Sequence, residues 1–363
     1  MEDSTLPILI NEKFRLQDME QEHYNRLVNF RPGDKEIVDI NPPRFSWPYL
    51  PKLVPKGWEV PVGYLFTLQI SDREDFQEPV LEVKDTPYNF YNYLPPLPGS
   101  GRWYWRIGYN AGTPSEKWSK VRCFTIDSKA EAWDRSALAS LNLASKNHPC
   151  ILFNRDNLEE IRRLKDTCEE SRDVARQMRL EADRIIKEDW WINFPKDDKQ
   201  SDEGGYRYYM MARDLLTVAF AHILFPDQKY LGFKERLIRM ASWPKGGYAS
   251  PEGAAPIRES REDDTQITEF LGLFFDWFYW DLIESERRIL IESLDWRIRH
   301  TINNFCWKLD DGKRMTVYSI ALVSSSHQYE NLMVIAPAAL AAYNHSASAR
   351  EALHLILNYL IGV

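Results

Sequence analysis

The spacing of hydrophobic residues changes once along the chain, near residue 129, and this change limits the possible fold more than any other feature. Before it, short segments alternate apolar and polar residues, a pattern typical of β-strands. After it, apolar residues recur every three or four positions, as they do in amphipathic helices. A chain of 363 residues is long enough for two domains or more. The sequence therefore predicts a β-rich domain followed by a helical domain.

The β-rich domain is predicted over residues 38–128, after an N-terminal extension at 1–37. In its clearest strand, Trp103, Trp105 and Ile107 fall on one side of the chain. Short strands at this spacing, separated by turn-forming residues, predict a β-sandwich. The expected strands are "GYLFTLQIS" (63–71), "GRWYWRIGY" (101–109) and "WSKVRCFTI" (118–126), preceded by the extended, proline-rich "NPPRFSWP" (41–48).

Residues 129–363 carry the helical pattern. Asn154 or Asn157 can cap the first long helix, and Ser285 can cap a later one. The expected helices cover 157–188 (one helix or two), 206–224, 230–243, 264–282, 285–305, 327–343 and 348–363. Short loops between them predict stacked helical hairpins, and no repeat of about 33 or 34 residues is present. The helix at 264–282 is apolar nearly all round, which predicts a buried position and favours an incomplete (α/α) toroid.

Composition excludes several classes of protein. A net charge of −8 argues against a nucleic-acid partner, because such proteins usually present a basic face. No segment reaches the roughly 20 apolar residues that span a bilayer, and no signal peptide is visible. The four cysteines lack CxxC spacing and are predicted to be small buried residues. The histidines other than His327 show no metal-ligand spacing. The sequence therefore predicts no metal and no cofactor.

The last residues, "HLILNYLIGV" (354–363), are apolar and lack a capping glycine motif or a polar tail. A terminus that buries its last turn needs a surface to dock on. We therefore expect this sequence to be a truncated part of a longer protein, with the C-terminal remainder of the parent chain as a partner.

Three segments together carry a resemblance to a known family: "NPPRFSWP", "LGLFFDWFYWDLIESERR" (271–288) and "SSSHQYENLMVIAPAALAAY" (324–343). The order of a β-sandwich and helical hairpins that contain them resembles the heparinase II/III-like polysaccharide lyases. The resemblance is closest to the branch with exo-acting oligoalginate lyases and exo-acting heparin lyases. It covers about residues 38–363.

The resemblance implies a fibronectin type III-like β-sandwich, an (α/α) toroid, and then a large antiparallel β-sheet domain that this sequence lacks. It implies β-elimination at the glycosidic bond of an acidic, uronate-containing oligosaccharide or polysaccharide, such as heparan sulfate or alginate. His327 matches the histidine at the start of a toroid helix in that family. The family's catalytic Tyr would come after Val363, so we expect the fragment to be inactive. A periplasmic or secreted location is likewise expected by resemblance alone.

The chemistry of such a lyase gives a physical reason for His327. The C5 proton beside an ionised carboxylate is very weakly acidic, so the carboxylate charge must first be offset by donors or a cation. Imidazole, with an ordinary pKa near 6.5, can act as a charged donor or as a neutral base. The N-terminus of a helix also favours an anionic ligand. Both roles stay open, and Glu330 or Asn331 on the same helix face can orient the ring.

Other residues are candidates for contacts with the sugar. Tyr206, Arg207 and Arg213, in "GGYRYYMMARD" (204–214), can stack on a sugar or bind carboxylate and sulfate groups. Gln266 and Glu269 lie at helical spacing near the start of the predicted buried helix. The aromatic run within that helix, "FFDWFYW" (274–280), is interpreted as core rather than as a sugar platform.

Two other classes of function remain open. A glycoside hydrolase on an (α/α) barrel needs two carboxyl groups across a cleft, and the dense acidic cluster Glu259, Glu262, Asp263 and Asp264 reads as a solvated loop. A non-catalytic glycan-binding protein needs no such pair of carboxyl groups. The products distinguish the classes, because hydrolysis creates no new carbon–carbon double bond.

Overall fold

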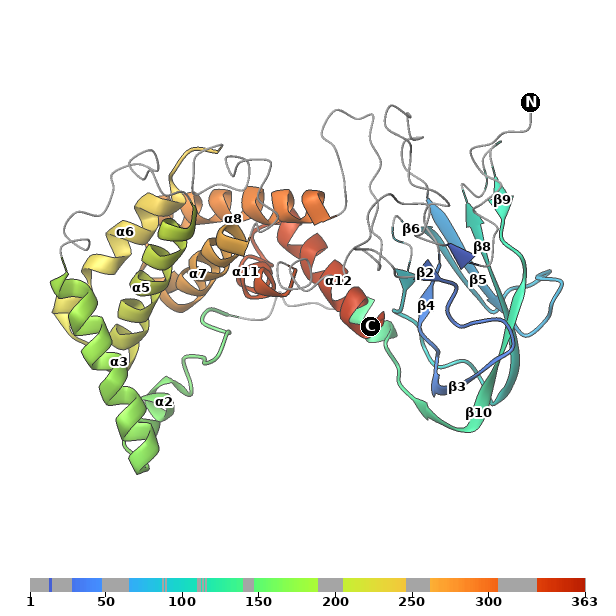
Figure 1. Ribbon diagram of the computed structural model, residues 1–363, viewed down its shortest axis with the longest axis horizontal. Helices are drawn as coiled ribbons and strands as arrows, with labels where there is room; N and C mark the ends of the chain where they lie inside the picture. Colours follow the sequence, from blue (N-terminus) through green and yellow to red (C-terminus); the bar gives the residue numbers. More distant parts are fainter. Residues whose placement is uncertain are drawn as a thin grey trace. The chain divides into compact units, whose positions relative to one another are not determined.

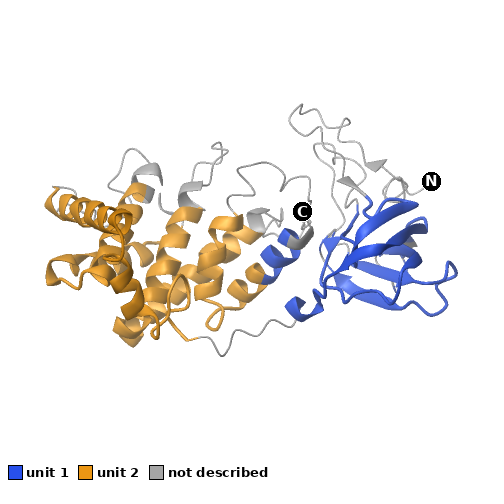
Figure 2. Cartoon of the chain, turned by 90° about the horizontal axis from the view of Figure 1, so that it is seen from below, with its two compact units in different colours: residues 1–141, 303–329, 354–363 blue, residues 142–302, 330–353 orange. Residues whose placement is uncertain are grey.

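The computed structural model describes residues 13–14, 28–47, 65–86, 88, 90–109, 112, 114, 116–139, 147–188, 205–245, 262–305 and 332–362. The protein has a mixed architecture, with one larger β-sheet and several helices (Figure 1). It divides into two compact units (Figure 2). The first unit contains residues 1–141, 303–329 and 354–363, and the second contains residues 142–302 and 330–353.

The first unit is built on a six-stranded sheet with the order β3-β10-β8-β5-β6, in which β9 also pairs with β8. The strand bounds are β3 (Glu36–Asn41), β5 (Phe66–Ser71), β6 (Leu81–Thr86), β8 (Gly101–Tyr109), β9 (Lys117–Trp118) and β10 (Arg122–Ala132). β3 and β10 are parallel, and the other pairs are antiparallel. Two small sheets pair β1 (Lys13–Phe14) with β2 (Val28–Asn29) and β4 (Phe45–Ser46) with β7 (Phe90–Tyr91).

The buried face of β8 confirms the alternation seen in the sequence. Trp103, Trp105 and Ile107 are buried, whereas Tyr104 and Arg106 between them are partly exposed. The three buried residues join Phe and Leu side chains from neighbouring strands in one hydrophobic core. β10 continues to Ala132, so the sheet extends past residue 128, where the sequence pattern placed the end of the β-rich domain.

The proline-rich segment at 41–48 has a structural role in this unit. Phe45 and Trp47 are fully buried in its core. The Asn41 side chain exchanges two hydrogen bonds with the backbone of Leu97, at 2.9 and 2.8 Å. Such pairing satisfies the buried amide and the buried backbone groups together. The segment is therefore held by the packing of Phe45 and Trp47 and by the hydrogen bonds of Asn41.

Arg135, just after β10, also binds this segment. Its Nη2 donates to the carbonyl oxygens of Pro42 and Pro43, at 2.6 and 3.0 Å. The side chain is fully buried, and this burial, with a smaller contribution from Arg44, lowers the pKa of the Arg135 guanidinium to about 10. A guanidinium with such a pKa still carries its charge at pH 7, so carbonyl dipoles take the place of a carboxylate partner.

The end of helix α12 (Ala347–Gly362) contributes to the same unit. Asn92 is fully buried, and its backbone N–H donates to Oδ1 of Asn358 at 2.9 Å. Its side-chain amide donates to the Asn358 carbonyl at 3.2 Å, and its Oδ1 accepts from the N–H of Phe45 at 3.0 Å. One asparagine thus links β4 to the last helix.

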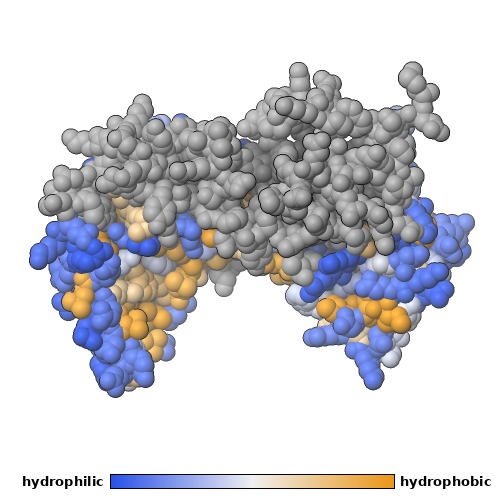
Figure 3. All heavy atoms as spheres, in the orientation of Figure 1, coloured by the Kyte–Doolittle hydropathy of each residue, from blue (hydrophilic) through white to orange (hydrophobic). Residues whose placement is uncertain are grey.

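The second unit is helical. Its main elements are α2 (Leu158–Leu164), α3 (Glu169–Lys187), α5 (Gly205–Leu224), α6 (Gly232–Ala241), α7 (Glu262–Phe278), η4 (Tyr279–Asp281), α8 (Glu284–Phe305) and α11 (Ala336–Ala341). α5 packs against α3, α6 and α7, and α7 also packs against α11. The outer surface along α3, at the lower left of Figure 3, is mostly hydrophilic, as expected of an amphipathic helix.

Most helix predictions hold, with corrections at two caps. The 157–188 region forms two helices, and the apolar helix is α7, whose residues from Ile267 to Phe278 are mostly buried. The cap at Ser285 was wrong, because α8 begins one residue earlier, at Glu284. Asn157 precedes α2 but makes no side-chain capping bond. Its Oδ1 instead accepts from the N–H of Asn154 at 2.7 Å.

α7 and α11 approach each other closely at Gly272. A Cβ atom at this position would lie 2.5 Å from the Cα of Ala338 and 2.7 Å from its Cβ. Glycine on one helix and alanine on the other let the two backbones come together, at the usual cost of glycine within a helix. This contact fixes α11 against the buried helix.

Among the described residues, none of the helices is both long enough and apolar enough to cross a membrane.

Candidate functional site

Five of the candidate residues lie where the structure gives no side-chain account. His327, Glu330 and Asn331 fall outside the described residues. Tyr206 and Arg207 belong to the first turn of α5, but their side chains are outside the described part. Their roles stay predictions.

Arg213 is described, and its electrostatic neighbours lie on α3 and on its own helix. It is exposed on α5, and its Nη2 lies 3.4 Å from Oδ1 of Asp214. Its charge also contributes, after Arg184, to lowering the pKa of Glu181 on α3. Among the described residues, no hydrogen bond or ion pair joins it to Gln266 or Glu269 on α7. The structure therefore does not gather these three candidates into one cluster.

Gln266 and Glu269 lie one turn apart on α7, and both are partly buried. Burial raises the pKa of the Glu269 carboxyl. Oε1 of Gln266 is buried without a hydrogen-bond partner among the described residues. Buried polar atoms are usually paired, so the unpaired Oε1 makes Gln266 an exception among the described polar side chains of α7.

We expect the Glu269→Gln variant to be more stable than the wild type at pH 7. Because the folded-state pKa of Glu269 is raised, its ionisation favours the unfolded state, and stability falls as pH rises from the ordinary glutamate value through the folded value. The gain should vanish below about pH 4, where the carboxyl is protonated in both states. Urea unfolding across this pH range measures it. Glu292→Gln, at an exposed position of α8, is the matched control. A gain that is the same at all pH values would contradict the prediction.

The structure does bring together a cluster that the sequence did not indicate, where residues 147–151 lie against α7. Asp276, in the last turn of α7, is fully buried. Its Oδ2 accepts from the backbone N–H groups of Cys150 and Ile151, at 3.0 and 2.8 Å. Its Oδ1 lies 2.7 Å from Nδ1 of His148. A buried carboxylate is stabilised by several such donors, so Asp276 anchors the segment.

Two tryptophans continue this anchoring. Nε1 of Trp277 donates to the carbonyl of Ile151 at 3.1 Å, and Nε1 of Trp280 donates to the carbonyl of His148 at 2.8 Å. The backbone of residues 148–151 is thus bound by side chains of α7 and the following η4. The aromatic run that was interpreted as core is buried from Phe274 to Phe278, while Trp280 is half exposed.

A second imidazole adjoins the first. Nε2 of His345, which follows α11, lies 3.3 Å from Nε2 of His148. The two rings are nearly parallel, with an interplanar angle of 21°. Tyr279 stacks on His148 with ring centroids 4.3 Å apart, and Phe275 meets both rings edge-on. Burial, then the neighbouring His148, lowers the pKa of the His345 imidazole. Two imidazoles therefore face each other inside an aromatic enclosure.

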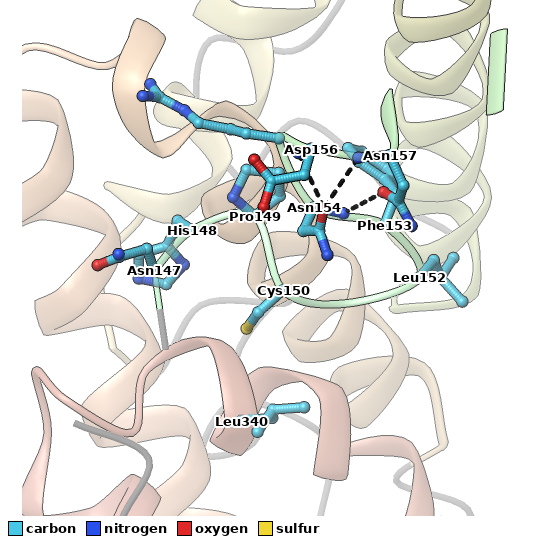
Figure 4. Close-up of a pocket in the computed structure, with 11 residues that line it drawn as sticks. Asn147, His148, Pro149, Cys150, Leu152, Phe153, Asn154, Asp156, Asn157 and Leu340 are labelled. Atoms are coloured by element: carbon cyan, nitrogen blue, oxygen red, sulfur yellow. Dashed lines mark hydrogen bonds between the residues drawn. The ribbon is translucent and has the colours of Figure 1, made fainter. Parts of the chain in front are cut away.

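This cluster borders a pocket of about 700 Å³. Figure 4 shows Cys150 between His148 and Asn147 at one end and Leu152 and Phe153 at the other. The lining is completed by Pro149, by Asn154, Arg155, Asp156 and Asn157 just before α2, and by Leu340 of α11. The pocket is thus lined by a largely buried imidazole, a thiol and several amides.

Sequence reasoning missed this cluster because its members are far apart in the chain: His148 and Asp276 are separated by 128 positions. One signal was available, since an aspartate inside an otherwise apolar helix must find donors when buried. The prediction of buried cysteines was wrong for the three described ones: Cys123 and Cys150 are partly exposed, and Cys168 is exposed.

The chemistry of the cluster is that of a carboxylate supporting an imidazole, with a second imidazole and a thiol nearby. Such a set can transfer a proton or bind a cation. The sequence matches no protein-family model and no curated protein.

Proposed function

We propose that this chain is the N-terminal part of a polysaccharide lyase that cleaves uronate-containing acidic glycans by β-elimination. The observation that carries the proposal is the order along the chain of a β-sheet unit and then paired helices. The three segments that resemble heparinase II/III-like lyases follow one another in this frame. The first supplies core residues of the sheet unit, and the second begins with the C-terminal half of the buried helix α7. The finer folds, a fibronectin type III-like sandwich and an (α/α) toroid, are part of the same proposal.

In this proposal His327 acts on the uronate, as the base or as the donor that offsets the carboxylate charge. The proposed sugar contacts are Tyr206, Arg207 and Arg213 on α5 and Gln266 and Glu269 on α7. Glu330 and Asn331 are proposed to orient His327. The exposed guanidinium of Arg213 supports a contact with an anionic sugar, because guanidinium groups bind carboxylates and sulfates in bidentate fashion. A periplasmic or secreted location belongs to the proposal as well.

Glu269 is the described residue that favours the second candidate, a glycoside hydrolase. A hydrolase needs a general acid with a raised pKa, and burial raises that of Glu269. It also needs a second carboxyl across the cleft. Burial raises the pKa of Asp214 too, but the charges that act on it are Arg213, Arg184 and Glu181, on α3 and its own helix. The described residues thus give Glu269 no partner carboxyl, which leaves the lyase as the stronger proposal.

The test compares the present chain with the longer parent chain that this proposal implies. We expect the parent to release product absorbing in the ultraviolet, from the unsaturated uronate, when incubated with heparan sulfate or alginate oligosaccharides. The present chain should show no turnover, because the proposed acid Tyr is missing. In the parent, His327→Ala should lower kcat by about 10²- to 10⁴-fold.

His222→Ala is the matched control, because this histidine lies in α5 with its Nδ1 near the carbonyl of Asp227 at 3.1 Å. The activity of the His222→Ala variant should stay near the wild-type value. Reducing sugar without absorbance would indicate a hydrolase, and binding without either product would indicate a glycan-binding protein. Full turnover by the present chain would contradict the missing-acid part of the proposal.

A further inference from the structure

The cluster around Asp276 contains two imidazoles, and one nitrogen atom of each is placed so that a proton or a cation can lie between them. Nε2 of His148 and Nε2 of His345 are 3.3 Å apart, and both rings are enclosed by Phe275 and Tyr279. Two nitrogens at this distance need a proton or a cation between them, because two lone pairs facing each other repel.

The tautomer of His148 follows from its other neighbour. Asp276 accepts hydrogen bonds from the N–H groups of Cys150 and Ile151, which marks it as a carboxylate. A carboxylate accepts only, so Nδ1 of His148 carries a proton and donates to Oδ1 across 2.7 Å. In the neutral ring Nε2 then presents its lone pair toward His345. Metal-binding histidines are supported in this same way by a carboxylate.

The separation of the two Nε2 atoms fits a tetrahedral ion. With metal–nitrogen bonds of about 2.0–2.1 Å, two imidazole ligands of a tetrahedral zinc ion lie about 3.3–3.4 Å apart. The observed 3.3 Å falls in this range. A hydrogen bond between two neutral imidazoles would give a similar distance, so a third ligand is needed to favour the ion.

Cys150 is the candidate for that ligand, because it lies beside both Asp276 and His148. Its Sγ lies 3.4 Å from Oδ1 of Asp276, the oxygen that also receives His148. Ligand atoms of His148, Cys150 and Asp276 all lie within 4.8 Å of one another. Cys150 and His148 both line the pocket, so an ion and its remaining ligand can enter from solvent. Thiolate and imidazole together select zinc-like ions over magnesium or calcium.

We propose that His148, His345 and Cys150 bind a divalent cation of the zinc class, with Asp276 as the hydrogen-bonding support of His148. The fourth position opens toward the pocket and takes water or a small anionic ligand. Arg287 is a positive charge that acts on His345; its guanidinium is stacked over Tyr279 at 4.5 Å, and Glu284 lies 3.6 Å from its Nη1. None of the described contacts that support this site involves His327.

The test uses the present chain without a histidine tag, treated with a chelator and then titrated with Zn²⁺ or Co²⁺. We expect one ion per chain, and a cobalt spectrum that contains a sulfur-to-metal charge-transfer band. Cys150→Ser should abolish that band. His345→Gln should weaken binding by at least tenfold, because even outer supports of a metal site contribute tenfold to a hundredfold. Cys168→Ser, at the exposed thiol that caps α3, is the matched control and should bind as the wild type does.

X-ray absorption at the zinc edge reports the ligand atoms of the wild-type protein directly. The test therefore stays decisive if a variant does not fold. One sulfur and two imidazole ligands are expected. A shell of oxygen and nitrogen without sulfur, no bound ion at millimolar Zn²⁺, or undiminished binding by folded His345→Gln would each overturn the proposal. None of these measurements depends on enzymatic activity, so failure of the lyase proposal leaves this result unaffected.

Discussion

Replacing Asp276 with alanine should destabilise the helical unit by about 3–5 kcal/mol, because it leaves buried donors without their acceptor. The carboxylate receives the N–H groups of Cys150 and Ile151 and the imidazole of His148, and it is fully buried. Water cannot replace it without opening the contact between residues 147–151 and α7. Urea unfolding followed by far-ultraviolet circular dichroism measures the loss.

Two further variants sharpen this prediction. Asp276→Asn keeps one acceptor oxygen but turns an amide N–H₂ toward other donors, so its loss should be intermediate. Asp281→Ala, at an exposed position in η4, should change stability by no more than about 0.5 kcal/mol. A loss below about 1 kcal/mol in Asp276→Ala would mean that the segment is held by Trp277 and Trp280 instead.

Gly272→Ala should destabilise the same unit by about 1–3 kcal/mol, although alanine is the better helix former by about 1 kcal/mol. The added Cβ would lie 2.5 Å from the Cα of Ala338, so one of the helices α7 and α11 must shift. Backbone atoms cannot rotate away as a flexible side chain can. The measurement is again urea unfolding, with the midpoint compared at equal slope.

A double-mutant cycle with Ala338→Gly provides the control. Alone, Ala338→Gly should cost about 1 kcal/mol through helix propensity. In the Gly272→Ala background it should recover part of the loss, because it removes the Cβ that would lie 2.7 Å away. Purely additive effects, or a more stable Gly272→Ala variant, would show that α7 and α11 do not meet as described.

The periodic parts of the sequence predicted much of the fold. Alternation in β8 identified its buried tryptophans, and the all-round apolar pattern of α7 identified a buried helix. Caps were less predictable. Asn157 has the right side chain for a cap, yet its Oδ1 accepts from Asn154, because short polar side chains have several local donors to choose from.

The candidate site was much less predictable. Periodicity reports which face of an element is buried, but not which side chains from distant segments meet. His148 and His345 are 197 positions apart, and only the packing of residues 147–151 and α11 around α7 brings them together. The resemblance instead directed attention to His327, which lies outside the described residues and stays a prediction.

The arrangement of the first unit has a consequence for how the protein is made. Its sheet needs the parallel pairing of β3 with β10. During synthesis, β3 can therefore pair only after the later strand β10 has been made. The bonds between Asn92 and Asn358 join residues 266 positions apart, so they form only when nearly all of this sequence has been translated. Domains usually fold in order from the N-terminus. Here the β-sheet unit, although synthesised first, acquires its last contacts after the helices that follow it.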